Sequence, residues 1–153
     1  MPNNVSVGVA FSDPVLSGAT IDNSVIGGSV PAAGSFTTLT STGAVTASAG
    51  FIMPSATVAA TGTNQATAAA IATGFTLVSA ADGTKGILLP AAAAGRTCVI
   101  KNNAAAVLKV WPASGDAVNA IAADSNYVLA SLTSTLLVAY DATTWYSVPL
   151  LAS

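Results

Sequence analysis

The feature that most constrains this chain is its shortage of charge. Only 7% of its 153 residues are charged, against roughly 25% in an ordinary soluble domain, while 52% are hydrophobic. A monomeric domain keeps its surface in water largely through charged side chains. A chain this poor in charge is expected to cover much of its surface with copies of itself or with another protein. Composition therefore predicts an assembly.

The identity of the charged residues predicts secondary structure. All six acidic residues are aspartates, glutamate is absent, and the four bases are Lys85, Arg96, Lys101 and Lys109. Helix surfaces are usually rich in Glu, Lys, Arg and Gln, whereas Asp beside Gly, Asn and Ser is typical of turns. We therefore expect an all-β protein. A formal net charge of −2 and the lack of a basic cluster argue against a nucleic-acid partner.

The chain is not expected to enter a membrane or to carry a secretion signal. Residues 23–81 hold no charge, but their apolar residues are mostly alanine, interrupted by Gly, Thr, Ser and Pro54. No run of about 20 strongly apolar residues results, so a membrane span is not predicted. The start, Met1–Asn4, lacks the positive region and apolar core of a signal peptide. We expect synthesis in a cytoplasm.

Residues 1–54 are expected to form an anchoring and oligomerisation arm. Apolar residues alternate with small ones in residues 5–11, which predicts a strand with one apolar face. Residues 35–53 hold short β-prone pieces that can bury themselves only when identical chains wind together into a short shaft. An unstructured linker is the alternative for this stretch. The predicted interface residues are Val5, Val7, Val9, Phe11, Ile26, Phe36, Leu39, Val45, Phe51 and Ile52.

Residues 55–153 are expected to form a displayed β-domain. Apolar, β-prone segments recur about every ten residues with turn residues between them, which is typical of an antiparallel β-sandwich or barrel. A hairpin is expected for residues 75–79 and 87–89, and another around the turn at residues 141–144. Residues 57–73 stay undecided between strand, short helix and irregular connection. The remaining predicted strands are residues 97–101, 107–111, 127–132, 135–140 and 145–148.

Two stretches resemble bacteriophage virion proteins. The segment from Ile21 to Leu39, IDNSVIGGSVPAAGSFTTL, resembles a motif common in phage fibre and virion-associated proteins. The block from Leu88 to Tyr146 resembles, more loosely, a β-domain at the ends of phage head and tail fibres and in decoration proteins. The chain is much shorter than most tail fibres, which favours a small head-decoration or head-fibre protein. The resemblance also implies a homotrimer.

The residues offer little for catalysis or cofactor binding. The chain has no histidine, which removes the commonest general base and metal ligand. The aspartates lie beside turn residues, so capping is favoured over paired-carboxylate chemistry. No phosphate-binding loop is present, and Cys98 is expected to be a buried strand residue. A calcium site of Asp116, Asn119 and Asp124 is a weaker alternative, because their spacing fits no known loop. We expect no enzyme activity, cofactor or metal.

The leading hypothesis is therefore a structural protein on the outside of a phage capsid, made in the host cytoplasm. Its expected partners are itself and the major capsid protein or another virion protein, with no nucleic acid and no membrane. The alternative is a short tail-fibre or adhesin module that binds host-surface glycans. Aromatic rings stack on sugar rings, although aromatics in strands are more often buried. The candidate glycan-binding residues are Trp111, Tyr127, Trp145 and Tyr146, with Tyr140 beside them.

Overall fold

The computed structural model of the chain describes residues 38–47 and 50–150. The chain divides into two units, Met1–Thr46 and Ala47–Ser153, and the strands found in the described residues all lie in the second. Strands make up 41% of the structure and helix 3%, so the predicted all-β class is confirmed. The helical part is one short 3-10 turn, η1 (Gln65–Thr67). Within the described ranges, no helix has the length and apolarity that crossing a membrane requires.

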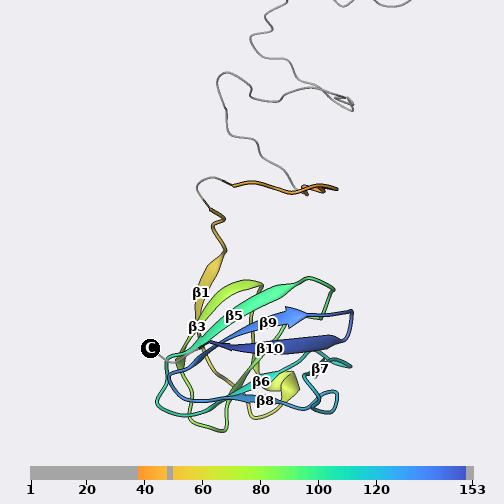
Figure 1. Cartoon of the computed structure of the whole chain (residues 1–153). Coiled ribbons are helices and arrows are strands. Elements are labelled where there is room, and N and C mark those ends of the chain that lie inside the picture. The colour runs from red at the N-terminus through yellow and green to blue at the C-terminus, as the bar shows by residue number, and fades with distance from the viewer. Residues whose placement is uncertain (1–37, 48–49, 151–153) are drawn as a thin grey trace, which may run out of the picture. The chain divides into compact units, whose positions relative to one another are not determined.

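The strands form two mixed sheets. Their bounds in chain order are β1 (Ser55–Ala59), β2 (Ala69–Ala70), β3 (Gly74–Ala80), β4 (Gly86–Leu88), β5 (Thr97–Asn102), β6 (Leu108–Trp111), β7 (Ala117–Val118), β8 (Tyr127–Leu129), β9 (Ser134–Ala139) and β10 (Thr144–Leu150). The larger sheet has the order β1-β3-β5-β9-β10-β7, and the smaller has the order β2-β4-β6-β8. Figure 1 shows β5, β9 and β10 side by side in one layer and β6 and β8 in the other.

The first six strands form a coil that resembles a β-solenoid. Successive strands alternate between the two sheets, so β1, β3 and β5 pair in parallel on one side and β2, β4 and β6 on the other. Each turn of the coil thus stacks on the turn before it. The chain then reverses: β8 pairs antiparallel with β6, and β9 pairs antiparallel with both β5 and β10. The reversed strands cover the last turn of the coil in both sheets.

The expected antiparallel arrangement is therefore wrong for the first half of the domain. Five of the eight pairings between strands are parallel. The predicted hairpin of residues 75–79 and 87–89 is also wrong, because β3 and β4 lie in different sheets. Gly86 allows the next turn of the coil to pack closely, since a Cβ there would lie 2.6 Å from the carbonyl oxygen of Lys109. The hairpin around residues 141–144 is confirmed as β9 and β10.

The undecided stretch, residues 57–73, contains parts of three elements. It holds most of β1, the 3-10 turn η1 and the two-residue strand β2. Asn64 begins η1, because its Oδ1 accepts a hydrogen bond from the Thr67 N–H at 3.1 Å. β2 then pairs in parallel with β4, so this stretch completes the first turn of the coil.

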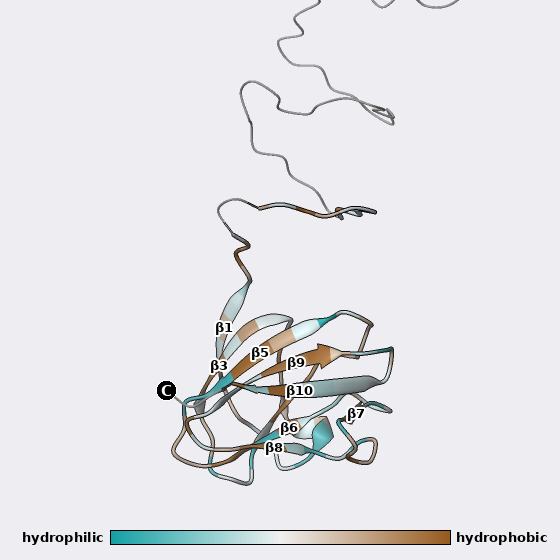
Figure 2. Ribbon diagram, viewed as in Figure 1, coloured by the Kyte–Doolittle hydropathy of each residue, from teal (hydrophilic) through white to brown (hydrophobic). Residues whose placement is uncertain are grey.

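The core lies between the two sheets. Alternate residues of β3, β5 and β9 point inward, and these positions are the buried ones in each strand. Figure 2 shows apolar residues along β5 and β9. The largest fully buried apolar side chains are Val78, Ile87, Leu89, Ile100, Leu108, Val110, Val118, Leu137 and Trp145. Trp145 comes from the last strand and completes this core.

Asn102 organises the corner that follows β5. Its side chain is fully buried, its Nδ2 donates to the carbonyl oxygens of Ala106 at 2.9 Å and Ala130 at 3.0 Å, and its Oδ1 accepts from the Ala104 N–H at 3.1 Å. These backbone groups belong to two separate segments, residues 104–106 and residue 130. One amide side chain therefore joins the backbone of both segments and pairs the buried N–H of Ala104.

Replacing Asn102 with alanine is expected to lower the free energy of unfolding by about 3 kcal/mol, because several buried backbone groups lose their partner. Chemical unfolding of the full chain measures this change. The matched control is Asn103→Ala at the neighbouring exposed position, which is expected to change stability by less than about 0.5 kcal/mol. Equal stability of the two variants would contradict the role of Asn102.

Candidate functional site

The aromatic residues proposed for sugar binding do not form one surface. Trp145 on β10 is 0% exposed and belongs to the core, where it pairs in register with Ala139 and Val118. A ring buried between two sheets cannot stack on a sugar from solvent. The expectation that Trp145 contributes to a glycan site is therefore corrected, and its role is to close the core.

Trp111 and Tyr127 are also placed away from a common aromatic face. Trp111 lies on β6 in the smaller sheet, and its indole ring packs over Gly86, where a Cβ would lie 2.8 Å from the ring. Its indole N–H is buried without a hydrogen-bond partner in the structure. Tyr127 on β8 packs against the core. Tyr146 belongs to the other sheet, so the four predicted residues are dispersed.

The exposed aromatic feature of the domain is a pair of tyrosines at the β9–β10 hairpin. Tyr140 is 73% exposed and Tyr146 is 50% exposed. Their ring centroids lie 6.0 Å apart at an interplanar angle of 78°, which is an edge-to-face arrangement. This pair joins one predicted glycan-binding residue, Tyr146, with its neighbour Tyr140. It offers a small aromatic patch that solvent can reach.

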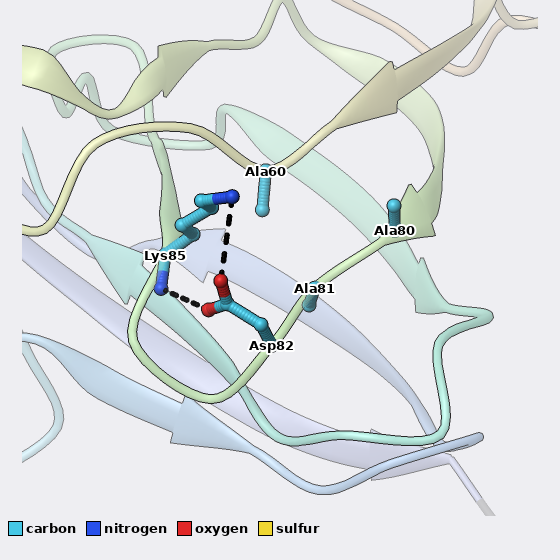
Figure 3. Close-up of a pocket in the computed structure, with 5 residues that line it drawn as sticks. All are labelled: Ala60, Ala80, Ala81, Asp82 and Lys85. Carbon is cyan, nitrogen blue, oxygen red and sulfur yellow. Dashed lines mark hydrogen bonds and ion pairs between the residues drawn. The ribbon is translucent and has the colours of Figure 1, made fainter.

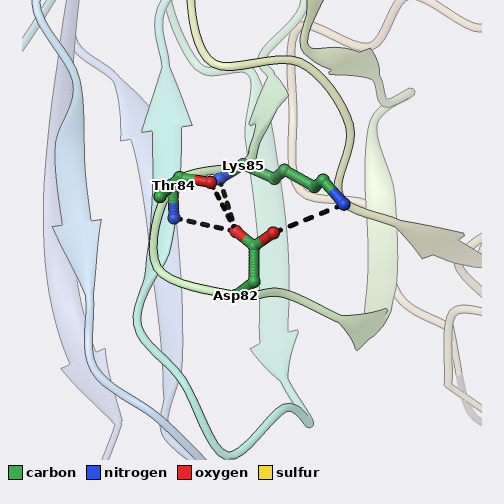
Figure 4. A network of polar contacts seen from close by, with 3 residues as sticks. All are labelled: Asp82, Thr84 and Lys85. Carbon is green, nitrogen blue, oxygen red and sulfur yellow. Dashed lines mark hydrogen bonds and ion pairs between the residues drawn. The ribbon is translucent and has the colours of Figure 1, made fainter.

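The Asp82 carboxylate is used by the turn between β3 and β4. One oxygen accepts hydrogen bonds from the N–H and Oγ1 of Thr84, at 2.9 and 2.7 Å, and from the Lys85 N–H at 3.0 Å; the other lies 3.3 Å from Lys85 Nζ (Figure 4). These contacts hold the pKa of Asp82 far below its usual range, with the Thr84 hydroxyl as the largest cause. The carboxylate is therefore a fixed anion that caps the turn.

A small hollow of about 120 Å³ lies beside this turn. Three alanines, Ala60, Ala80 and Ala81, line it together with Asp82 and Lys85 (Figure 3). The two charged groups face each other across it and form an ion pair, and the other walls are methyl groups. With both charged side chains already paired, the hollow offers a ligand little beyond a shallow apolar recess. We assign it no catalytic role.

Asp141 and Asp124 also hold backbone groups in place. The Asp141 carboxylate accepts from the N–H groups of Thr143 and Thr144 at 2.8 and 2.7 Å, and the Thr143 hydrogen bond is the main reason that its pKa is lowered. Asp124 accepts from Gln65 Nε2 at 3.0 Å and from the Gly115 N–H at 2.8 Å. Its pKa is also lowered, chiefly by Gln65. Each carboxylate fixes local backbone.

The proposed calcium set of Asp116, Asn119 and Asp124 is also engaged elsewhere. The buried Asp116 accepts from the Ala92 N–H at 2.7 Å. Asn119 makes two hydrogen bonds, both at 2.9 Å, to the side chain and backbone of Ser147 on β10. Across residues 38–47 and 50–150, no group of three His, Cys, Asp or Glu side chains is placed to hold a metal ion.

Cys98 lies inside the core on β5, as the sequence predicts. Its side chain is buried, and its Sγ lies 3.9 Å from the carbonyl oxygen of Ala72. Burial raises the pKa of the thiol to about 11. At neutral pH the sulfur is protonated, and a thiol in this state is a weak nucleophile.

Four of the predicted interface residues can be examined, and all are exposed in the single chain: Leu39, Val45, Phe51 and Ile52. Ile52 is 99% exposed, and the next residue, Met53, is exposed as well. Consecutive exposed apolar side chains, such as those of residues 51–53, are typical of a contact with another molecule. The other predicted residues lie outside the described part of the chain: Val5, Val7, Val9, Phe11, Ile26 and Phe36.

A second apolar surface, which was not predicted from the sequence, lies on the side of the larger sheet that faces away from the core. We call it the outer face and define it by Phe75, Leu77, Val99, Leu136, Val138, Tyr146, Val148 and Leu150. The sequence does carry a signal for this surface, because apolar residues occupy both odd and even positions along a strand, as in residues 136–139, and do not alternate with polar ones. A strand of this kind is usually covered on both faces.

Comparisons with known proteins add no family to this picture. No family model matches the chain, and no curated protein or solved structure gives a significant match. The exposed apolar surfaces are therefore the features from which a function can be argued.

Replacing Trp145 with alanine is expected to lower the free energy of unfolding by about 4 kcal/mol, because it opens a cavity in the core. Tyr146→Ala, at the next position but on the outer face, is expected to cost less than about 1 kcal/mol. Chemical unfolding of both variants checks this. A Trp145→Ala chain as stable as Tyr146→Ala would contradict the burial of the tryptophan.

The lowered pKa values of Asp82, Asp124 and Asp141 make stability depend on acid. Protons bind these groups more tightly in the unfolded chain, so their contribution is present above about pH 4 and is lost as the pH falls further. With no histidine in the chain, the thermal midpoint is expected to be flat from pH 5 to 8 and to fall below about pH 4.

Thermal unfolding between pH 2 and 8 measures this dependence. Asp141→Asn keeps an oxygen that can accept from the Thr143 and Thr144 N–H groups but removes one titrating site. The variant is expected to show a shallower loss of stability in acid than the natural chain. A midpoint that rises on acidification would show that the aspartates do not act in this way.

Proposed function

We propose that this chain is a non-enzymatic structural protein of a bacteriophage particle, which assembles with its own copies and displays residues 55–153 on the outside of the capsid. The observation that carries the proposal is the run of exposed apolar side chains directly before β1, namely Phe51, Ile52 and Met53. The resemblance of residues 21–39 to phage virion proteins is the reason for placing the protein in a phage particle. The homotrimer implied by that resemblance is part of the proposal.

The energetics of this run favour contact with other chains. Burying a side chain such as Phe, Ile or Met stabilises a protein by about 1.5–3 kcal/mol. Three such side chains in water on every copy are a substantial driving force for association. Their attachment to the domain is firm, because the Pro54 carbonyl accepts a hydrogen bond from the Phe75 N–H at 2.9 Å, where β3 begins. The run therefore leads directly into the displayed domain.

An adhesive role also fits the polar groups. Asp82 and Asp141 bind the backbone of their own turns, Asp124 binds the Gly115 N–H and Gln65, and Asp116 binds the Ala92 N–H. Carboxylates committed to turns are not arranged as an acid–base pair. The chemistry that remains is surface recognition, by which many equivalent copies on a shell would strengthen or decorate it.

Glycan binding is the second candidate, and the Tyr140–Tyr146 pair is the observation that favours it. An exposed edge-to-face pair presents a ring surface to which the apolar side of a sugar can bind. A glycan array of host polysaccharides tests this candidate. Binding that is lost in Tyr146→Ala with unchanged unfolding would favour an adhesin, and no binding on the array would leave the structural role alone.

The structural role is tested on particles of the phage that encodes the chain. Particles lacking the protein are expected to lose density on the outside of the head in a cryo-EM map and to disrupt earlier on heating or in low salt. Added protein should restore both properties. Ile52→Asp is expected to restore neither, because it places a charge in the contact, whereas Val128→Asp on the smaller sheet should act as the natural chain does. Unchanged head density in particles lacking the protein would refute the proposal.

A further inference from the structure

The outer face of the larger sheet has an apolar row at its centre. In register across four strands, Phe75 on β3, Val99 on β5, Leu136 on β9 and Val148 on β10 form this row. The flanking rows are mixed: one contains Leu77, Lys101, Ser134 and Leu150, and the other contains Thr97, Val138 and Tyr146. Side chains two residues apart on a strand share a face, so these residues all point away from the core.

This face is uncovered in the part of the chain that the structure describes. Val148 is 47% exposed, and Phe75, Tyr146 and Leu150 are also exposed. The inward positions of the same strands, such as Ile100 and Leu137, are completely buried. The sheet is therefore apolar on both sides but packed against the smaller sheet on only one. Sheets of this composition are usually covered on their second side as well.

The charge of the face restricts what can cover it. Lys101 is the one charged residue in the three rows, and its Nζ donates to the carbonyl oxygen of Leu132 at 2.6 Å. The ammonium is thus directed to its own chain. A face whose single charged group is directed to its own chain is best matched by another face that presents little charge, since burying an unpaired charge is costly. The outer face of a second copy has that property.

The shape of the outer face, with a recess at one end and protruding side chains at the other, suits packing between copies. Over β1 and β3 it is hollowed, with a recess of about 290 Å³ lined by Ser55, Ala56, Thr57, Phe75 and Leu77. Over β10 it carries the exposed side chains of Tyr146, Val148 and Leu150. Contacts that join two different patches of identical chains can close into a ring when the rotation allows it. A recess at one end and bulky side chains at the other supply such patches.

The area is consistent with this occupant when the run before β1 is included. Four strands at about 4.8 Å spacing and three rows about 7 Å apart give a face of roughly 400 Å². A stable interface buries about 800 Å² per partner. The outer face supplies about half of this area, and the exposed Phe51, Ile52 and Met53, which directly precede the edge strand β1 in the chain, offer further apolar surface for contact.

We propose that the outer face binds a second copy of this chain and forms the contact between the displayed domains. This inference rests on the proposed function, because it assigns to the displayed domain a share of the self-association that the proposed function places in residues 1–54. It adds Val99, Leu136, Val148 and Phe75 to the interface. The smaller sheet then faces outward in the assembly.

The test compares two valines of similar exposure on opposite sheets. Val148 lies on the outer face, and Val128 on β8 is 53% exposed on the smaller sheet. Sedimentation velocity of the full natural chain is expected to show an oligomer. Val148→Asp should raise the dissociation constant roughly 100-fold, because the interface would bury an unpaired charge. Val128→Asp should sediment as the natural chain does, and the circular dichroism spectra of both variants should show an intact fold.

Cysteine labelling provides a second measurement that does not depend on a charge. The natural Cys98 is buried with a pKa of about 11, so it reacts slowly with a maleimide. In the oligomer, Val148→Cys is expected to react at least several-fold more slowly than Val128→Cys. On dilution to monomer the two rates should become similar.

The outcomes separate the two proposals. An oligomer that survives Val148→Asp and labels both cysteines equally overturns the outer-face contact, while the proposed function stands on the arm residues. A natural chain that is a monomer at all concentrations overturns both. An oligomer weakened by Val148→Asp, with Val148→Cys protected, supports the contact.

Discussion

The domain depends on the contact between its two sheets through every second side chain. The inward residues of β3, β5 and β9 meet those of β4, β6 and β8, and successive turns of the coil place equivalent positions above one another. The buried surface is built mainly from Val, Ile and Leu, with Trp145 as the largest residue. Because each strand turns only alternate side chains inward, nearly half of its residues must face outward. What those outward residues are decides how the protein behaves in water.

Their character explains the shortage of charge. A soluble domain of this shape would carry Lys, Glu or Asp at the outward positions of its central strands. Here Val99, Leu136 and Val138 take such positions, with Lys101 as the one charged residue among them, and Asp82 and Asp141 lie in turns, where their oxygens bind N–H groups. The composition therefore reflects a specific placement of apolar side chains on one sheet. Association with copies of the chain is our explanation for that placement.

Much of the fold could be predicted from local patterns, because alternation and turn residues are local properties. The strands around residues 75–79, 97–101 and 135–140 and the final hairpin occur where the sequence places them. Strand partners could not be predicted in this way. Asp82 and Asp141 cap turns with similar hydrogen bonds, yet the first turn leads to the other sheet and the second closes a hairpin. Likewise, adjacent aromatics at positions 145 and 146 look alike in sequence, and only the pairing register buries Trp145.

The position of Trp145 on the last strand has a consequence for synthesis. β10 is the last of the ten strands to leave the ribosome, so a nascent chain holds an incomplete core until this strand pairs with β9. The same strand carries Val148 on its opposite side. The side chain that completes the interior and one that contributes to the outer face therefore arrive together. Until then the apolar side chains that Trp145 covers stay exposed, which makes a partly made subunit prone to non-specific association.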